Sequence, residues 1–243
     1  MKRMSALLAF LLLGAGCSSS AAEPEPKTEA EKALYSLGNV TGQSMLRYRM
    51  SKEEFDCWMA GFQDAYAKRP PKVDIVVWRP KLEPLLRTRS ETTRDEQKKL
   101  GQEFLAKVAT EQGIQKTQSG LLYRMLREGT GMTPGRDDKV RVNYSGKLVD
   151  GTEFDSSANH GGPVTLEVRQ VVRCWGEGLR LMKEGSKAKL YCPPETAYGD
   201  MGARPFVPPG ATLTFDVELL KVEKQPPAPS PATTPATPAP PKP

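Results

Sequence analysis

The stretch that decides the fold is Val142-Asn-Tyr-Ser-Gly-Lys-Leu-Val-Asp-Gly-Thr-Glu-Phe-Asp-Ser-Ser157. Val140, just before this stretch, and Val142 and Tyr144 within it alternate with polar residues, which is typical of a strand with one buried face. Asp150-Gly151 is a common turn between antiparallel strands, because glycine adopts positive φ without steric cost. The stretch therefore predicts a β-hairpin.

The same alternation recurs on both sides of this hairpin. It is found in Leu122, Arg124 and Leu126, in Ala188, Leu190 and Cys192, and in Leu213, Phe215, Val217 and Leu219. One short helical pattern, from Trp175 to Lys183, lies between these strands. About five antiparallel strands wrapped on one short helix form an α+β domain, and we place it at residues 119–224.

Two further strings follow the first along the chain. They are Pro194-Glu-Thr-Ala-Tyr-Gly199 and Pro208-Pro-Gly-Ala-Thr-Leu-Thr-Phe-Asp-Val-Glu-Leu219. Taken together and in this order, the three strings resemble the FKBP-type peptidyl-prolyl cis-trans isomerases along the full length of their catalytic domain. The resemblance implies an enzyme that twists X-Pro amides in an apolar pocket and assists the folding of proline-containing polypeptides. It also implies inhibition by macrolide FKBP ligands.

The resemblance assigns roles to individual residues. Asp155 and Tyr198 are the expected catalytic positions, with Trp175 as the floor beneath the proline ring. The Tyr198 hydroxyl and the Val172 amide are expected to anchor substrate carbonyls. The remaining substrate-binding positions are Tyr144, Phe154, Val171, Phe206, Val207 and Phe215. Aromatic residues along strands also serve as core, and an Asp before Ser-Ser also caps turns, so these readings stand beside the functional ones.

Four positions depart from the family pattern. Val164 stands where the family has a pocket phenylalanine, Ala203 replaces a loop histidine, and Cys174 replaces the glycine before the tryptophan. His160 stands where an arginine commonly pairs with the aspartate. It is either the partner of Asp155 or a histidine of a flexible loop. We therefore expect a pocket that is wider on one side.

Between about Glu29 and Glu111 the apolar spacing is helical. A first helix is expected near Ala30 to Arg49, and a second begins at the capping box of Ser51 and Glu54. Ser90 to Glu111 suits a long solvated helix that connects two modules. The prolines before it predict a loop with short helical pieces, since proline interrupts helices; they are Pro70, Pro71, Pro80 and Pro84.

Gly38 and Gly42 lie one turn apart on the first helix, where each costs roughly 1 kcal/mol relative to alanine. Either they allow a partner helix to approach closely, or they are tolerated on a frayed helix. Leu34 to Gly38 with Gly42, and Phe55 to Phe62, resemble the dimerisation domain of Mip-like FKBP proteins. The resemblance implies a homodimer, with residues 29–118 as the helical dimerisation domain and linker helix.

The chain ends suggest export. Residues 1–16 combine Lys2 and Arg3 with an apolar run and small residues before Cys17, as in a signal peptide. The small residues before Cys17 resemble a bacterial lipobox, which implies a lipidated cysteine; the alternative is an ordinary signal peptide followed by a chance cysteine. Residues 17–28 are expected to be a tether and the Pro-rich residues 225–243 a disordered tail. Together with Ser18 after the cysteine, this predicts a lipoprotein anchored to the outer membrane and facing the periplasm.

Several function classes fit the sequence poorly. The net charge of +6 comes without a dense basic block, which disfavours nucleic acid as a partner. One histidine and no nucleophile placed beside a base disfavour a hydrolase. The four cysteines lack the paired spacing of a zinc site, so we expect no metal and no cofactor. The alternative to the enzyme is a non-enzymatic holding chaperone or surface-binding module.

Cys174 and Cys192 form a candidate disulfide. Cys192 shares a strand face with Leu190, opposite the charged Lys189, so it should point into the core. Cys174 precedes Trp175 at the start of the helix that packs on this face. Either the two thiols are bonded, closing a loop of about 17 residues worth roughly 3 kcal/mol, or they are separate core residues. Cys57 is expected to be unpaired.

Overall fold

The structure is a computed structural model, and it describes residues 25–225. The expectations for the signal peptide, for Cys17 and for the Pro-rich tail lie outside these residues. The described chain divides into two compact units, with the boundary after Asn39 inside the first helix. No helix in residues 25–225 has both the length and the apolar character that crossing a bilayer requires.

The N-terminal region is helical, as expected. It contains α1 (Glu29–Met45), the 3₁₀ helix η1 (Leu46–Tyr48), α2 (Lys52–Tyr66) and α3 (Ile75–Val108). The chain leaves η1 at Arg49, which adopts the left-handed conformation with φ of 46°. The capping box at the start of α2 is confirmed, because Ser51 Oγ accepts from the Glu54 amide while the Glu54 carboxylate accepts from the Ser51 amide.

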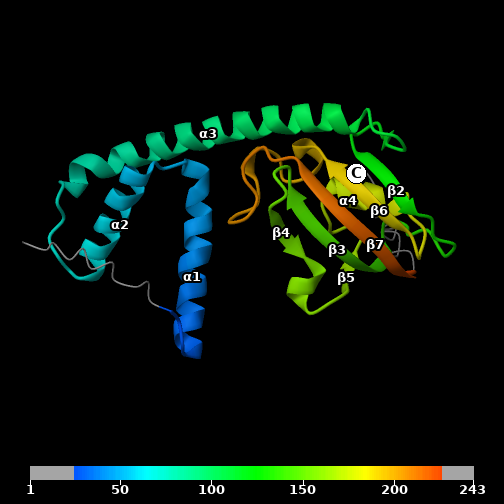
Figure 1. The fold of residues 1–243 in the computed structure, drawn as a ribbon, viewed down its shortest axis with the longest axis horizontal. Coiled ribbons are helices and arrows are strands. Elements are labelled where there is room, and N and C mark those ends of the chain that lie inside the picture. Colours follow the sequence, from blue (N-terminus) through cyan, green and yellow to red (C-terminus); the bar gives the residue numbers. More distant parts are fainter. Residues whose placement is uncertain (1–24, 226–243) are drawn as a thin grey trace, which may run out of the picture. The chain divides into compact units, whose positions relative to one another are not determined.

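The expectation of a broken helix around Pro80 and Pro84 was wrong. Both prolines lie inside α3, which runs as one continuous helix (Figure 1). Asp74 caps this helix by accepting from the amides of Val76 and Val77, so it begins before the prolines are reached. Both prolines are exposed, and water can therefore hydrate the carbonyls that lose their helical donors. The predicted helix from Ser90 thus starts fifteen residues earlier, at Ile75.

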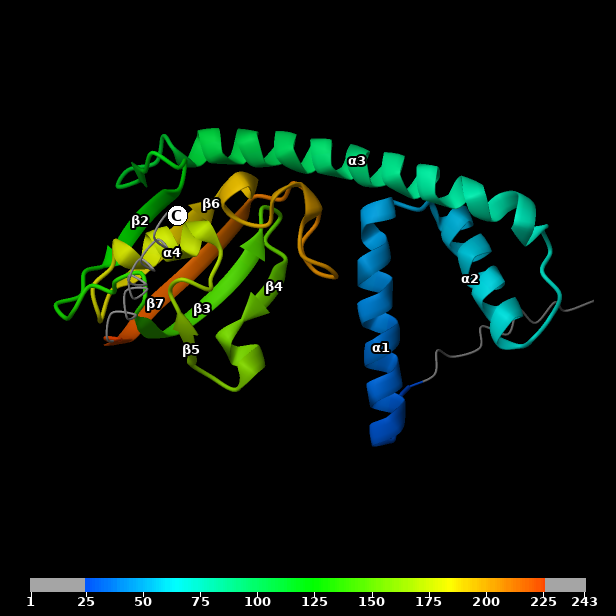
Figure 2. The same ribbon diagram turned by 180° about the vertical axis from the view of Figure 1, so that it is seen from behind.

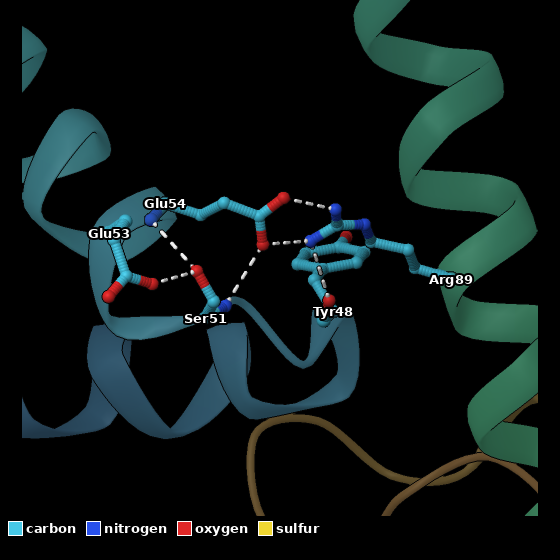
Figure 3. A network of polar contacts seen from close by, with 5 residues as sticks. All are labelled: Tyr48, Ser51, Glu53, Glu54 and Arg89. Atoms are coloured by element: carbon cyan, nitrogen blue, oxygen red, sulfur yellow. Dashed lines mark hydrogen bonds and ion pairs between the residues drawn. The ribbon is translucent and has the colours of Figure 1, made fainter.

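A polar network fixes the start of α2 against α3 (Figure 3). Arg89 donates to both carboxylate oxygens of Glu54, at 2.8 and 2.5 Å, and to the Tyr48 carbonyl at 3.3 Å. The same Glu54 carboxylate accepts from the Ser51 amide at 2.9 Å. The Arg89 guanidinium, and next the Ser51 amide, lower the pKa of Glu54 from 4.5 to about 2.

The Glu54 network gives a pH prediction. A carboxyl group with a depressed folded pKa stabilises the folded state above its unfolded pKa, and this contribution is lost as the pH falls from about 4.5 through about 2. Glu54→Gln should therefore lower the melting temperature at pH 7, and its difference from wild type should vanish near pH 2. Thermal unfolding followed by circular dichroism measures this difference. The exposed Glu128→Gln serves as the matched control, and an equal loss in both variants would contradict the assignment.

The C-terminal region is an antiparallel sheet wrapped on α4 (Arg173–Arg180), which Figure 2 shows lying against the strands. The sheet has seven strands, more than the five expected, because two short strands join it. The strand order is β1-β2-β6-β7-β3-β4, with β5 paired to β3. The strands are β1 (Gln115–Lys116), β2 (Leu122–Arg127), β3 (Lys139–Leu148), β4 (Glu153–Ser156), β5 (Val164–Glu167), β6 (Lys187–Cys192) and β7 (Leu213–Glu223).

The predicted hairpin is β3 and β4. Gly151 has a φ of 89° and the Asp150 carboxylate accepts from the Thr152 amide, which closes the turn. The helix α4 begins two residues before Trp175 and ends at Arg180, earlier than expected, because the amides of Leu181 and Met182 bond to carbonyls three residues back. Gly178 lets α4 approach β6 closely, since a Cβ there would lie 2.7 Å from Leu190.

The main core fills the space between α4 and the sheet. Leu179, Leu190, Leu213 and Val217 are fully buried there. The expected alternation in β2 holds only in part: Leu126 is exposed, and Tyr123 and Met125 pack on the core instead.

The charge of Lys189 predicted that the outer face of β6 is open to solvent, but part of this face is buried. Tyr191 and Leu122 are buried under the end of α3, where Phe104 lies 6.0 Å from the Tyr191 ring. The reason is that a helix distant in sequence covers the face that charge patterning marks as solvent-facing.

Candidate active site

The site is built around Trp175 in the first turn of α4. Its side chain is 4% exposed, and two aromatic rings meet it edge to face. The Tyr144 ring from β3 lies 5.1 Å away at 88°, and the Phe215 ring from β7 lies 5.3 Å away at 82°. Phe154 from β4 extends the cluster, 5.6 Å from Phe215 at 85°. Four of the predicted pocket residues thus converge from one helix and three strands.

Gly146 makes room for this cluster, and the sequence reasoning did not single it out. A Cβ at position 146 would lie 2.8 Å from both the Phe154 and the Phe215 rings. The register of β3 places Gly146 opposite Phe215 on β7 and opposite Asp155 on β4. A glycine inside a predicted strand indicates that another group packs closely against the backbone there, and Gly146 lies within the stretch from Val142 to Ser157.

A hydrogen-bonded carboxylate lies at the polar edge of the aromatic cluster. The Tyr144 hydroxyl donates to Asp155 Oδ2 at 2.6 Å, and His160 Nε2 lies 3.0 Å from Asp155 Oδ1. Of the two readings of His160, the structure therefore favours the partner of Asp155. The Ser157 hydroxyl bonds to the backbone of Tyr144, which ties the segment after β4 to β3.

The two tyrosines at this edge are held in the protonated form. Burial, and next the hydrogen bond to Asp155, raise the pKa of Tyr144 well above its usual value. Burial and the charge of Asp155 also raise the pKa of Tyr198, whose side chain is 38% exposed. Both phenols are therefore hydrogen-bond donors at neutral pH.

The remaining predicted positions lie on the connections around the cluster. Val172 is the N-cap residue of α4, and it packs on the core together with Val171 and Val164. Phe206 and Val207, two adjacent predicted substrate-binding positions, differ in exposure. Phe206 is 44% exposed, whereas Val207 is buried and pairs with Ala203 through two backbone hydrogen bonds. Phe206 is thus the member of the pair that can contact a ligand.

The Cys174–Cys192 disulfide is confirmed, with the two Cα atoms 5.8 Å apart. Both residues are fully buried, and Cys192 points into the core as predicted. The bridge joins the residue before Trp175 to the end of β6, within the core cluster that also contains Trp175 and Phe215. Cys57 is exposed and free, as expected.

The site can bind an apolar group against aromatic walls and donate hydrogen bonds at its rim. Within residues 25–225, no cluster of three or more His, Cys, Asp or Glu side chains is arranged to hold a metal ion. Trp175 Nε1 has no hydrogen-bond partner in this part of the chain, and unpaired buried donors are uncommon in folded proteins.

Comparison with known proteins agrees with this geometry. Residues 131–220 match the family model of FKBP-type peptidyl-prolyl cis-trans isomerase, and residues 30–125 match that of the domain amino terminal to it. The chain is 37% identical to the FKBP-type 22 kDa peptidyl-prolyl cis-trans isomerase of Escherichia coli over 82% of this chain and 98% of that protein.

Two further relatives cover most of the sequence and the fold. Peptidyl-prolyl cis-trans isomerase Mip of Coxiella burnetii is 33% identical over 93% of this chain and 100% of that protein. The crystal structure of FkpA from Escherichia coli superposes with a TM-score of 0.62 at 34% identity, covering 83% of this chain and 100% of that one. The chain belongs to the FKBP-type peptidyl-prolyl cis-trans isomerases, enzymes that act on proline-containing polypeptides.

Proposed function

We propose that the X-Pro amide is twisted over Trp175, in the pocket bounded by Tyr144, Phe154 and Phe215. The observation that carries this assignment is the set of edge-to-face aromatic contacts around a nearly buried indole. Amide resonance sets a barrier of about 18–20 kcal/mol to rotation. An apolar pocket disfavours the charge-separated resonance form, and a shape complementary to the twisted amide lowers the barrier further.

The polar groups at the rim position the substrate. The protonated Tyr198 hydroxyl donates to a substrate carbonyl, and the Val172 amide at the start of α4 anchors another. Asp155 lies beside the amide carbon, held by hydrogen bonds to Tyr144 and His160. No step requires a nucleophile or a metal, because no covalent bond is made or broken during the rotation.

The test is a proline-limited refolding assay with the protein lacking residues 1–27. The wild-type protein should accelerate the slow phase, and a macrolide FKBP ligand should abolish the acceleration. Acceleration that survives saturating macrolide would place the activity outside this pocket.

A second activity as a holding chaperone is supported by the surface of α1 and α2. No residue of α1 is buried, and Leu34, Tyr35, Phe62 and Tyr66 are all more than half exposed. Apolar surface of this kind either captures unfolded chains or is covered by a partner. Suppression of aggregation of a client without prolines would show the holding activity independently of isomerisation.

We also propose that residues 29 to about 69 hold a homodimer, and that residues 119–224 form a separable isomerase domain. The exposed side chains of α1 and α2 support this, and so does the open space around Gly38 and Gly42, where an added Cβ meets nothing within 4 Å.

The dimer gives a direct prediction. Light scattering should find two chains at micromolar concentration for the protein from residue 28, and one chain for residues 119–224 alone. Phe62→Glu should dissociate the dimer, because burying an unpaired carboxylate at an interface is costly. Leu126→Glu, the same kind of change at an exposed position of β2 outside residues 29–69, is the matched control and should leave the dimer intact. A monomeric wild-type protein would remove the proposal.

The proposed location is the bacterial cell envelope, with the chain anchored through a lipid on Cys17 in the outer membrane and facing the periplasm. The buried Cys174–Cys192 bridge supports an oxidising compartment, since disulfides persist there. Metabolic labelling with a fatty acid tests the anchor. Label should be incorporated by the wild-type protein and lost in Cys17→Ser.

A further inference from the structure

A second cleft, lined by arginines, lies apart from the aromatic cluster. It has a volume of about 450 Å³ and is formed by three segments: the face of α3 from Glu83 to Arg94, the residues Arg47 and Tyr48 of η1, and the loop from Asp200 to Arg204. In the sequence this loop lies between Tyr198 and Phe206, which are both residues of the proposed catalytic pocket. The cleft and the pocket thus share one loop.

Arg47 is a buried cation in this cleft. The residue is 8% exposed, and its guanidinium donates to the Met201 carbonyl at 3.5 Å, the outer limit of a hydrogen bond. Over residues 25–225 no carboxylate lies within ion-pair distance of it. The buried Thr93 hydroxyl donates to the Arg47 carbonyl at 2.8 Å, and this bond holds the Arg47 backbone against α3.

The surroundings increase the cost of this charge. Burial, and next the charge of Arg204, lower the pKa of Arg47. The carboxylate of Asp200 on the same wall is already paired with Lys98 at 2.5 Å. Arg94 is paired with Asp95. Glu83 and Glu91 also line the cleft, but among residues 25–225 neither forms an ion pair with Arg47 or Arg204. Desolvating a cation is costly unless it is paired, so an anion entering the cleft offsets this cost for Arg47 and weakens its repulsion by the exposed Arg204.

The rest of the wall selects the kind of anion. Leu86 and Met201 offer apolar surface beside the arginines. Glu83 and Glu91 on α3 repel every anion, and they repel an ion with several negative charges more strongly than one with a single charge. A single carboxylate on a short aliphatic stem satisfies both conditions, because its stem covers the apolar wall while its oxygens accept from the guanidinium groups.

We propose that this cleft binds an acidic side chain of the polypeptide whose proline occupies the pocket over Trp175. The cleft is then a specificity site that favours clients with Asp or Glu near the proline. The inference rests on the proposed function of the pocket, since the shared loop from Tyr198 to Phe206 is what connects the two sites.

The experiment compares matched fluorescent peptides. Each peptide has one Leu-Pro bond and one Glu, moved through successive positions on either side of the proline, and each has a partner with Gln in place of Glu. Anisotropy gives Kd, and the isomerisation rate is measured on the same peptides. At the productive spacing the wild-type protein should bind the Glu peptide roughly tenfold more tightly than the Gln peptide, the effect of a charge-assisted hydrogen bond.

Variants locate this preference in the cleft. Arg47→Met keeps the side-chain volume and removes a buried unpaired charge, so it should fold and bind both peptides equally. Arg204→Gln on the exposed loop should reduce the preference in the same direction. Arg136→Gln removes an exposed positive charge that does not line the cleft and should keep the full preference.

The outcomes separate the two proposals. Equal Kd values for Glu and Gln peptides at every spacing, or a preference that persists in Arg47→Met, would overturn the acidic subsite even if both peptides are isomerised. A preference that depends on Arg47, with no acceleration of either peptide, would keep the subsite and overturn the catalytic pocket. In Asp155→Ala/Tyr198→Phe, the subsite predicts that turnover falls while the Glu preference remains.

Discussion

Replacing Asp155 with Ala and Tyr198 with Phe together should lower kcat/KM for X-Pro isomerisation by roughly 100-fold, about tenfold for each group. The Tyr198 hydroxyl is partly buried and protonated, so in its proposed role its removal leaves a substrate carbonyl without a donor. The Tyr144 hydroxyl donates to Asp155 at 2.6 Å, so removing the Asp155 carboxylate also leaves this hydroxyl without its acceptor. A protease-coupled or refolding assay measures the loss.

The control is Tyr66→Phe, the same change at a tyrosine of α2 that is 85% exposed. It should leave kcat/KM unchanged. Circular dichroism of the double variant checks that the fold is retained, since neither replacement removes a fully buried side chain. A folded double variant that accelerates proline-limited refolding as well as wild type would show that the residue roles proposed for this pocket are wrong.

Removing the disulfide should give the largest loss of stability. The Cys174→Ala/Cys192→Ala variant should lower the free energy of unfolding by roughly 3 kcal/mol, because the bridge closes a loop between residues 18 apart in sequence and restricts the unfolded chain. Urea denaturation of the oxidised protein measures it. Wild type unfolded and refolded in a reducing buffer should match the double variant.

Cys57→Ala is the matched control for this experiment. Cys57 is exposed and unbonded, so its replacement should change the free energy of unfolding by less than about 0.5 kcal/mol. Equal stability of oxidised wild type and the double variant would contradict a structural role for the bridge. A loss of isomerase activity larger than the loss of folded protein would show in addition that the bridge positions Trp175.

Local chemistry explains why much of the fold could be predicted. The Asp150-Gly151 turn and the alternation through Val140 and Val142 predict β3 and β4 because turn geometry and burial on one face act between neighbouring residues. The capping box at Ser51 and Glu54 is equally local, and it marks the start of α2 correctly. The family strings then predicted which aromatic residues converge, and the structure brings Tyr144, Trp175 and Phe215 together.

Two predictions from local sequence were wrong, one because the prolines lie on an exposed helix surface and one because a segment distant in sequence covers the sheet. Pro80 and Pro84 lie inside α3 because Asp74 caps the helix and water reaches the exposed carbonyls. Tyr191 is buried because the end of α3, more than eighty residues away in sequence, covers its side of β6. Residue type and spacing carry no information on such coverage.

The sequence by itself determined the isomerase family, the hairpin, and the aromatic residues available for a pocket, because these depend on residue order and on contacts between neighbours along the chain. The tertiary structure alone decided that His160 lies against Asp155, that Cys174 and Cys192 bond, and that Arg47 is buried beside Met201. In each case the outcome depends on distances between side chains that separate chain segments bring together. Those distances are set by the packing of the whole sheet and of α3, which no local pattern specifies.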